Sequence, residues 1–172
     1  MRQAVRTIYV AAVLAAAHVA VAEDALLWNV PEPLQPAVEA PSFTGVFEIG
    51  TWLNPFYIRG DFDGDGFFDY AILLRRRSDG KKGIAVWLSG RSSSGLIVLG
   101  AGRKARAGGG ETDDWGFFDA WQVYGKRTVL QGAGEGKPPK LIGEAILIEK
   151  TESASGLLYW DGRQFRWYQQ GD

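Results

Sequence analysis

Short runs in which apolar and polar residues alternate follow one another along the chain after residue 70, separated by stretches rich in glycine and polar residues. A period of two places successive side chains on opposite faces, which is typical of a half-buried β-strand. We predict strands over residues 70–76, 83–89, 96–99, 117–124, 128–131, 141–149, 157–160 and 163–168. Residues 43–53 fit either a short helix or a first strand, and residues 100–114 and 132–139 are predicted as long loops. The spacing predicts an all-β fold of about seven or eight antiparallel strands, arranged as a sandwich, an open barrel or a blade-like stack of sheets.

Two Asp-Gly sequences predict tight turns between neighbouring strands. Residues 78–81, Ser-Asp-Gly-Lys, lie between the first two predicted strands, and Asp161-Gly162 lies between the last two. A two-residue turn at Asp161-Gly162 pairs Trp160 with Arg163. Four apolar side chains then share one face, which we assign to the core: Leu158, Trp160, Phe165 and Trp167. Tyr168 falls on the opposite face, so its replacement is expected to have a mild effect.

The first 22 residues predict an export signal. Arg2 and Arg6 precede an apolar run over residues 8–17, and residues 20–22, Ala-Val-Ala, supply the small-x-small pattern of a cleavage site. This arrangement is typical of a secretory signal peptide, and the apolar run is too short for a membrane-spanning helix. Cleavage near Ala22 predicts a periplasmic or secreted protein without a membrane anchor.

Two further segments follow the predicted signal peptide. Residues 23–42 contain four prolines and are predicted to form an extended N-terminal arm. Residues 43–172 are predicted to form a single β domain, since a chain of this length normally folds around one core.

The residue types left after residue 22 narrow the possible chemistry. The chain has no cysteine, and its single histidine, His18, and single methionine, Met1, lie within the predicted signal peptide. A histidine-based triad, a thiol nucleophile, an ordinary zinc site and a disulfide are therefore excluded from the mature chain. Without Arg2 and Arg6, the chain keeps 17 of its 19 basic residues and all 20 acidic ones, which gives a net charge of −3. No stripe of basic residues suggests a nucleic acid partner. We expect a protein that is not an enzyme.

The strongest chemical signal is the sequence of residues 60–69, Gly-Asp-Phe-Asp-Gly-Asp-Gly-Phe-Phe-Asp. Alternate residues of a tightly wound loop point inward, so three of its aspartates can converge on one ion. Hard divalent cations take oxygen ligands, and Ca²⁺ takes six to eight of them in a flexible shell. The predicted metal ligands are Asp61, Asp63, Asp65, the carbonyl of Phe67, and Asp69.

The predicted calcium loop, residues 61–69, is shorter than that of an EF-hand. A full EF-hand loop ends in a bidentate glutamate at position twelve, where this chain has Ile72. The alternative is a solvated acidic surface loop without an ion. Four neighbouring carboxylates repel one another in the absence of a cation, and this repulsion favours the metal site.

This loop and the apolar residues after it resemble the calcium loop of FG-GAP/VCBS repeats. The resemblance covers residues 60–74, and residues 152–162 are also similar to small exported bacterial proteins that carry one such loop. It implies a Ca²⁺ cofactor and an adhesive or secreted protein, but it implies no enzymatic activity. We identify one copy of the loop, and one blade cannot close a propeller ring.

A second group of acidic and aromatic residues follows the glycine-rich loop. Asp113, Asp114, Trp115 and Asp119 form a possible ligand surface, because aromatic rings stack on sugars and carboxylates accept their hydroxyl protons. Two of these carboxylates at a suitable separation could also serve as acid and base in glycoside hydrolysis. The third interpretation is structural: the aromatic rings belong to the core and the acids cap a loop.

Three hypotheses for function follow. The favoured one is an exported, Ca²⁺-stabilised, non-enzymatic β domain that binds a protein or a glycan at the cell envelope. The second is a carboxylate-dependent polysaccharide hydrolase using Asp113, Asp114 or Asp119, for which a carboxyl group with a raised pKa would be the sign. The third is a purely structural periplasmic protein.

Overall fold

The structure is a computed structural model that describes residues 26–90, 95–133 and 136–171. The predicted signal peptide, residues 1–22, lies outside the described residues. By its internal contacts the chain divides into two compact units, Met1–Pro36 and Ala37–Asp172. All strands of the described residues belong to the second unit.

Short helical turns take the place of the predicted extended arm in the part of it that is described. They are the 3₁₀-helix η1 and the helices α2 and α3, with bounds Glu32–Leu34, Gln35–Glu39 and Pro41–Thr44. Pro31 directly precedes η1, and Pro41 is the first residue of α3. Proline is compatible with the first turn of a helix, where its missing N–H has no intrahelical partner to lose. The prolines of this segment therefore start helices instead of keeping the chain extended.

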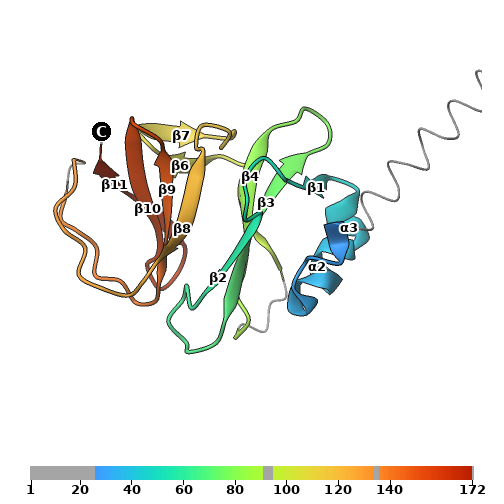
Figure 1. The fold of residues 1–172 in the computed structure, drawn as a ribbon, viewed down its shortest axis with the longest axis horizontal. Coiled ribbons are helices and arrows are strands. Elements are labelled where there is room, and N and C mark those ends of the chain that lie inside the picture. The colour runs from blue at the N-terminus through green and yellow to red at the C-terminus, as the bar shows by residue number, and fades with distance from the viewer. Residues whose placement is uncertain (1–25, 91–94, 134–135, 172) are drawn as a thin grey trace, which may run out of the picture. The chain divides into compact units, whose positions relative to one another are not determined.

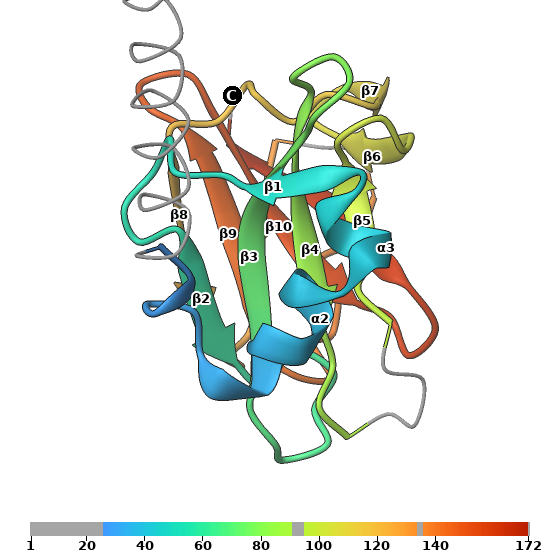
Figure 2. The same ribbon diagram turned by 90° about the vertical axis from the view of Figure 1, so that its right-hand side faces the viewer.

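The first sheet is antiparallel and is built around β3. Its strands are β1 (Phe47–Ile49), β2 (Tyr57–Gly60), β3 (Asp69–Arg76), β4 (Lys82–Trp87) and β5 (Ile97–Gly100). The order is β1-β3-β4-β5, and β2 also pairs with β3. Ile49 pairs with Leu74, and Tyr57 pairs with Ile72. β1 and β2 thus follow one another along the same edge of β3 (Figure 2).

The second sheet is an antiparallel meander near the C-terminus. Its order is β11-β10-β9-β8, with bounds Phe165–Gly171, Ala154–Trp160, Ala145–Lys150 and Ala120–Tyr124. A separate two-stranded hairpin is formed by β6 (Ala105–Ala107) and β7 (Gly110–Thr112). The all-β prediction is confirmed, and none of the described sheets closes into a barrel.

The main core lies between the two sheets (Figure 1). The first sheet contributes side chains of β3 and β4, and the second contributes side chains of β8, β9 and β10. The fully buried members include Ala71, Leu73, Ile84, Val86 and Ile146. This burial is the chief driving force for closing one sheet onto the other.

One loop prediction and one strand prediction differ from the structure. The predicted loop at residues 100–114 contains the β6–β7 hairpin, whose turn includes Gly108 with φ +58°. The predicted strand at residues 128–131 is not a strand, although Val129 is buried. Val129 packs in a small second core on the outer face of the second sheet, so it is buried without strand pairing.

The last hairpin has the predicted core face but a different register. Trp160 pairs with Phe165, and Leu158 pairs with Trp167. This pairing leaves a connection of four residues, 161–164. The Asp161 carboxylate stabilises it by accepting hydrogen bonds from the N–H groups of Arg163 and Gln164, both at 2.9 Å. A shift of two residues keeps each side chain on its face, so the predicted core assignment survives the wrong pairing.

The opposite face of this hairpin is not simply a solvated surface. Tyr168 is 7% exposed and packs in the second core, whose other buried members are Val129, Leu141, Ala145 and Leu157. Its hydroxyl also accepts a hydrogen bond of 3.0 Å from the N–H of Gly132. Because the connection between β8 and β9 covers this ring, we now expect replacement of Tyr168 to cost more stability than the mild loss predicted from the sequence.

Candidate metal centre

The acidic loop, residues 61–69, is the connection between β2 and β3. The two strands stay paired up to Gly60 and Asp69, so the ends of the loop are held together by the sheet. Two backbone positions of tight curvature are accommodated within this closed hairpin. Gly64 and Gly66 have φ of +78° and +89°, in the left-handed region that favours glycine.

Three of the predicted ligands converge. Asp61, Asp63 and Asp65 each offer a carboxylate oxygen, and these oxygens lie within 4.8 Å of one another. Asp63 is only 7% exposed, so one of the three carboxylates is largely withdrawn from water. This group could hold a metal ion, and its oxygen-only donor set suits a hard cation.

Hydrogen bonds from the backbone of the loop hold these carboxylates in position. Asp61 accepts from the N–H groups of Gly64, at 2.8 Å, and Gly66, at 3.1 Å. Asp65 accepts from the N–H of Phe67 at 2.9 Å. The loop is therefore wound around its own acidic side chains. The Phe67 side chain points outward from this wound loop and is 65% exposed.

Asp69 is the predicted ligand with the most different surroundings. It is fully buried, and its carboxylate accepts hydrogen bonds from the N–H groups of Phe62, at 2.8 Å, and Ser89, at 2.9 Å. Burial raises the pKa of the Asp69 carboxyl above its ordinary value, while these hydrogen bonds oppose the shift. Asp69 lies outside the group of three converging carboxylates and connects the loop to the segment just after β4.

The acidic loop also contacts the segment that leads into β9. The N–H of Asp61 donates to Glu144 Oε2 at 2.9 Å, and the N–H of Glu144 donates to the carbonyl of Asp61 at 2.6 Å. A Cβ atom on Gly143 would lie 2.3 Å from that same carbonyl oxygen, so only glycine permits the approach. Sequence reasoning missed Glu144 because it is 83 residues from Asp61 and was assigned to a predicted strand.

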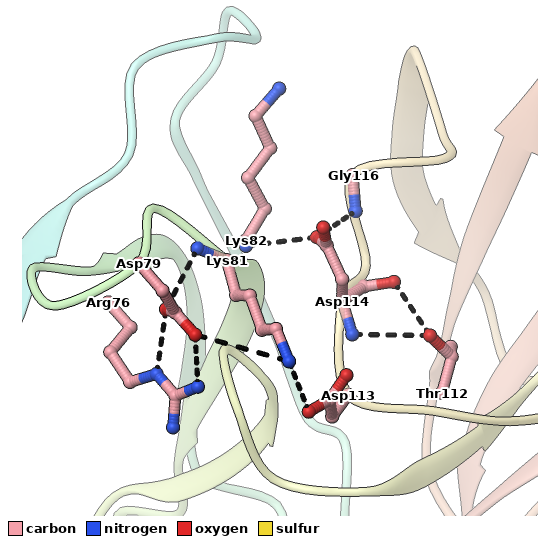
Figure 3. A network of polar contacts seen from close by, with 8 residues as sticks. All are labelled: Arg76, Asp79, Lys81, Lys82, Thr112, Asp113, Asp114 and Gly116. Atoms are coloured by element: carbon pink, nitrogen blue, oxygen red, sulfur yellow. Dashed lines mark hydrogen bonds and ion pairs between the residues drawn. The ribbon is translucent and has the colours of Figure 1, made fainter.

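The second predicted group of residues does not form one site. Figure 3 shows Asp113 and Asp114 directed to different partners. Lys81 Nζ lies 2.6 Å from Asp113 Oδ2, whereas Asp114 Oδ1 accepts from the N–H groups of Lys82, at 3.1 Å, and Gly116, at 3.0 Å. Asp113 thereby attaches the segment after β7 to the turn between β3 and β4, and Asp114 attaches it to the first residue of β4.

Trp115 and Asp119, the other two residues of the predicted ligand surface, make contacts of their own and do not join these acids in one site. Trp115 is fully buried, with its ring against Trp167 and Phe117, so its faces are covered by protein. Asp119 Oδ1 accepts from the N–H and the hydroxyl of Thr151, both at 2.7 Å. The hydrogen bonds from Thr151 lower the pKa of Asp119, and the Lys81 ammonium lowers that of Asp113. A general acid for glycoside hydrolysis needs the opposite shift.

Comparison with known proteins gives no identity for the chain: no family model, curated protein or solved structure matches it. The helices in the described residues all fall short of the length and apolar character needed to span a membrane.

Proposed function

We propose that this protein is an exported, non-enzymatic β domain that Ca²⁺ stabilises and that binds a protein or a glycan at the cell envelope. The observation that carries the proposal is the convergence of Asp61, Asp63 and Asp65 within 4.8 Å in a loop that also contacts the second sheet. Export rests on the signal-peptide pattern of residues 1–22. The resemblance of residues 60–74 to FG-GAP/VCBS loops supports both Ca²⁺ and a secreted protein.

Calcium suits these residues better than magnesium does. Asp61, Asp63 and Asp65 would hold the ion, and the spacing of the loop adds the carbonyl of Phe67 and the carboxylate of Asp69. A mixed set of carboxylate and carbonyl oxygens on a flexible loop is what Ca²⁺ accepts, whereas Mg²⁺ requires a strict octahedron and retains several waters.

A bound divalent cation would supply positive charge where three carboxylates meet. Neutralisation removes their mutual repulsion and keeps the loop in its wound form. That form carries the paired hydrogen bonds between Asp61 and Glu144, which connect the β2–β3 hairpin to the start of β9. The ion is therefore proposed to stabilise the contact between the two sheets, and not to take part in a reaction.

The test is thermal unfolding of the mature chain with millimolar Ca²⁺ and with EDTA. A ligand that binds only the folded state adds RT ln(1 + [L]/Kd), about 2.7 kcal/mol at a concentration of 100 Kd, so the melting temperature should rise with Ca²⁺. Asp63→Ala should abolish this rise, and Mg²⁺ at the same concentration should reproduce little of it.

Glu111→Gln is the matched control, because Glu111 is an exposed acid outside the acidic loop. It should keep the full response to Ca²⁺. Identical wild-type melting curves in Ca²⁺ and in EDTA would reject the calcium part of the proposal.

A further inference from the structure

The long connection between β8 and β9 forms a pocket on the second unit. Its walls are two stretches of the chain, residues 126–129 and 138–141, and its volume is about 420 Å³. The lining residues are Lys126, Arg127, Thr128, Val129, Pro138, Pro139, Lys140 and Leu141. Three of these eight side chains are cationic and none is acidic, in a chain whose formal net charge is −1.

The three cations of this pocket are available to a ligand. Lys126, Arg127 and Lys140 are exposed, and among the described residues none of them forms an ion pair with an acidic side chain. Arg127 is held in place by stacking over the ring of Tyr124, 4.1 Å from its centroid. Elsewhere in the same unit, Arg76, Lys81 and Arg166 each pair with an aspartate. In the described part of this unit, the three charges of the pocket are therefore not neutralised by acidic side chains.

The floor of the pocket is apolar and buried. Val129 and Leu141, one from each wall, are 5% and 8% exposed and pack together in the second core. Pro138 and Pro139 restrict the backbone of the second wall, because the proline ring fixes φ. Cations on both walls of the hollow can approach one anion from two sides, and this favours binding.

We infer that this pocket binds an acidic sugar unit of a polysaccharide, with the carboxylate or sulfate group between Lys126 and Arg127 on one wall and Lys140 on the other. Ammonium and guanidinium groups make charge-assisted hydrogen bonds to such anions. The volume lies within the roughly 300–1,000 Å³ of small-ligand sites, and the proline and aliphatic carbons offer an apolar surface to a sugar ring. A hollow suits a ligand that enters it, whereas a flat membrane surface contacts protruding residues. The inference names the ligand class for the partner binding proposed above, and it does not depend on calcium.

The experiment measures binding of the mature protein to polygalacturonate and dextran sulfate, with neutral dextran and phosphatidylglycerol vesicles as comparators. The wild type should bind both acidic polymers, more weakly as ionic strength rises toward about 0.15 M. The pocket variant, Lys126→Gln/Arg127→Gln/Lys140→Gln, should lose affinity by roughly tenfold or more. The matched variant, Arg103→Gln/Lys104→Gln/Arg106→Gln, removes the same charge from other exposed positions and should stay within about twofold of wild type.

Several outcomes would overturn the inference: no binding of either acidic polymer, an equal loss in both triple variants, or binding of the vesicles in place of the polymers. Binding of neutral dextran that both variants retain would reject this pocket and leave a glycan partner in place. Each measurement is made in Ca²⁺ and in EDTA beside a melting curve. Pocket-dependent binding without any effect of Ca²⁺ on melting would reject the calcium proposal alone.

Discussion

Residues 66–69 and 116–119 have the same sequence, Gly-Phe-Phe-Asp, in opposite environments. In the first copy Phe68 is 58% exposed and Asp69 is fully buried. In the second, Phe118 is 3% exposed, and the side chain of Asp119 is 42% exposed. The pKa values of the two aspartates shift in opposite directions, upward for Asp69 because it is buried and downward for Asp119 because Thr151 donates to it.

The segments that contain these tetrapeptides differ at one position in particular. Residues 61–69 and 111–119 align over nine positions and share an aspartate at the third, occupied by Asp63 and Asp113. The fifth position is Asp65 in the first segment and Trp115 in the second. A buried indole draws the second segment into the core, whereas a third carboxylate keeps the first at the surface. The shared residues therefore do not decide which segment could hold a metal ion.

Replacing the residue at the fifth position by alanine should give the largest difference in stability between the two segments. Trp115→Ala removes a fully buried ring that packs against Trp167, and we expect it to lower the free energy of unfolding by about 3–5 kcal/mol. Asp65→Ala should change the stability of the Ca²⁺-free protein by less than about 1 kcal/mol, because Asp65 is exposed. Urea unfolding in EDTA measures both values. Trp28→Ala is the control for loss of an indole, since Trp28 is 87% exposed, and an equal loss in Trp28→Ala and Trp115→Ala would contradict the comparison.

The eighth position should give the next largest difference. Phe118→Ala leaves a cavity in the main core, and we expect a loss of about 3 kcal/mol. Phe68→Ala removes an exposed ring that lies under the Arg59 guanidinium, 4.3 Å from its centroid, so the loss should be below about 1 kcal/mol. Parallel urea titrations compare the two variants. Similar losses would mean that the exposed copy is also packed in solution.

Glu144 bonds to the first of the two segments, residues 61–69, and connects it to the start of the second sheet. Glu144→Ala leaves the half-buried N–H of Asp61 without its acceptor, and we expect a loss of about 1–2 kcal/mol in the free energy of unfolding. Glu144→Gln keeps an oxygen at the same place and should recover most of that stability. Chemical denaturation of the two variants in EDTA separates this contact from any effect of the metal. Equal stability of Glu144→Ala and wild type would remove the proposed connection between the sheets.

Local patterns were sufficient to predict much of this molecule. Alternation predicted β3, β4 and the core face of the last hairpin, and aspartate spacing predicted the convergence at Asp61, Asp63 and Asp65. Contacts between distant residues were not accessible in this way. The pairing of Asp61 with Glu144 spans 83 residues, and no local sequence pattern predicts it.

Two other predictions failed for different physical reasons. The register of the last hairpin depends on how the Asp161 side chain caps its own turn, which a two-residue turn rule does not contain. The burial of Tyr168 depends on a loop that closes over the outer face of the second sheet. The first is a local side-chain contact and the second is a tertiary contact, and each decides between alternatives that the sequence pattern leaves open.

The ninth position should give the smallest difference, and one that depends on pH. Since the folded-state pKa of Asp119 is lowered from 3.8, its ionised carboxylate contributes stability that is present above pH 3.8 and is lost as pH falls through the folded pKa. Asp119→Asn should therefore lower the melting temperature slightly at neutral pH, and the difference from wild type should shrink as the pH is taken below 3.8. Melting curves across this range measure it. Thr151→Val removes the hydroxyl that donates to Asp119, so Asp119→Asn should have a smaller effect in that background. A difference between wild type and Asp119→Asn that grows toward low pH would show that this carboxylate, like that of its buried counterpart, has a raised pKa.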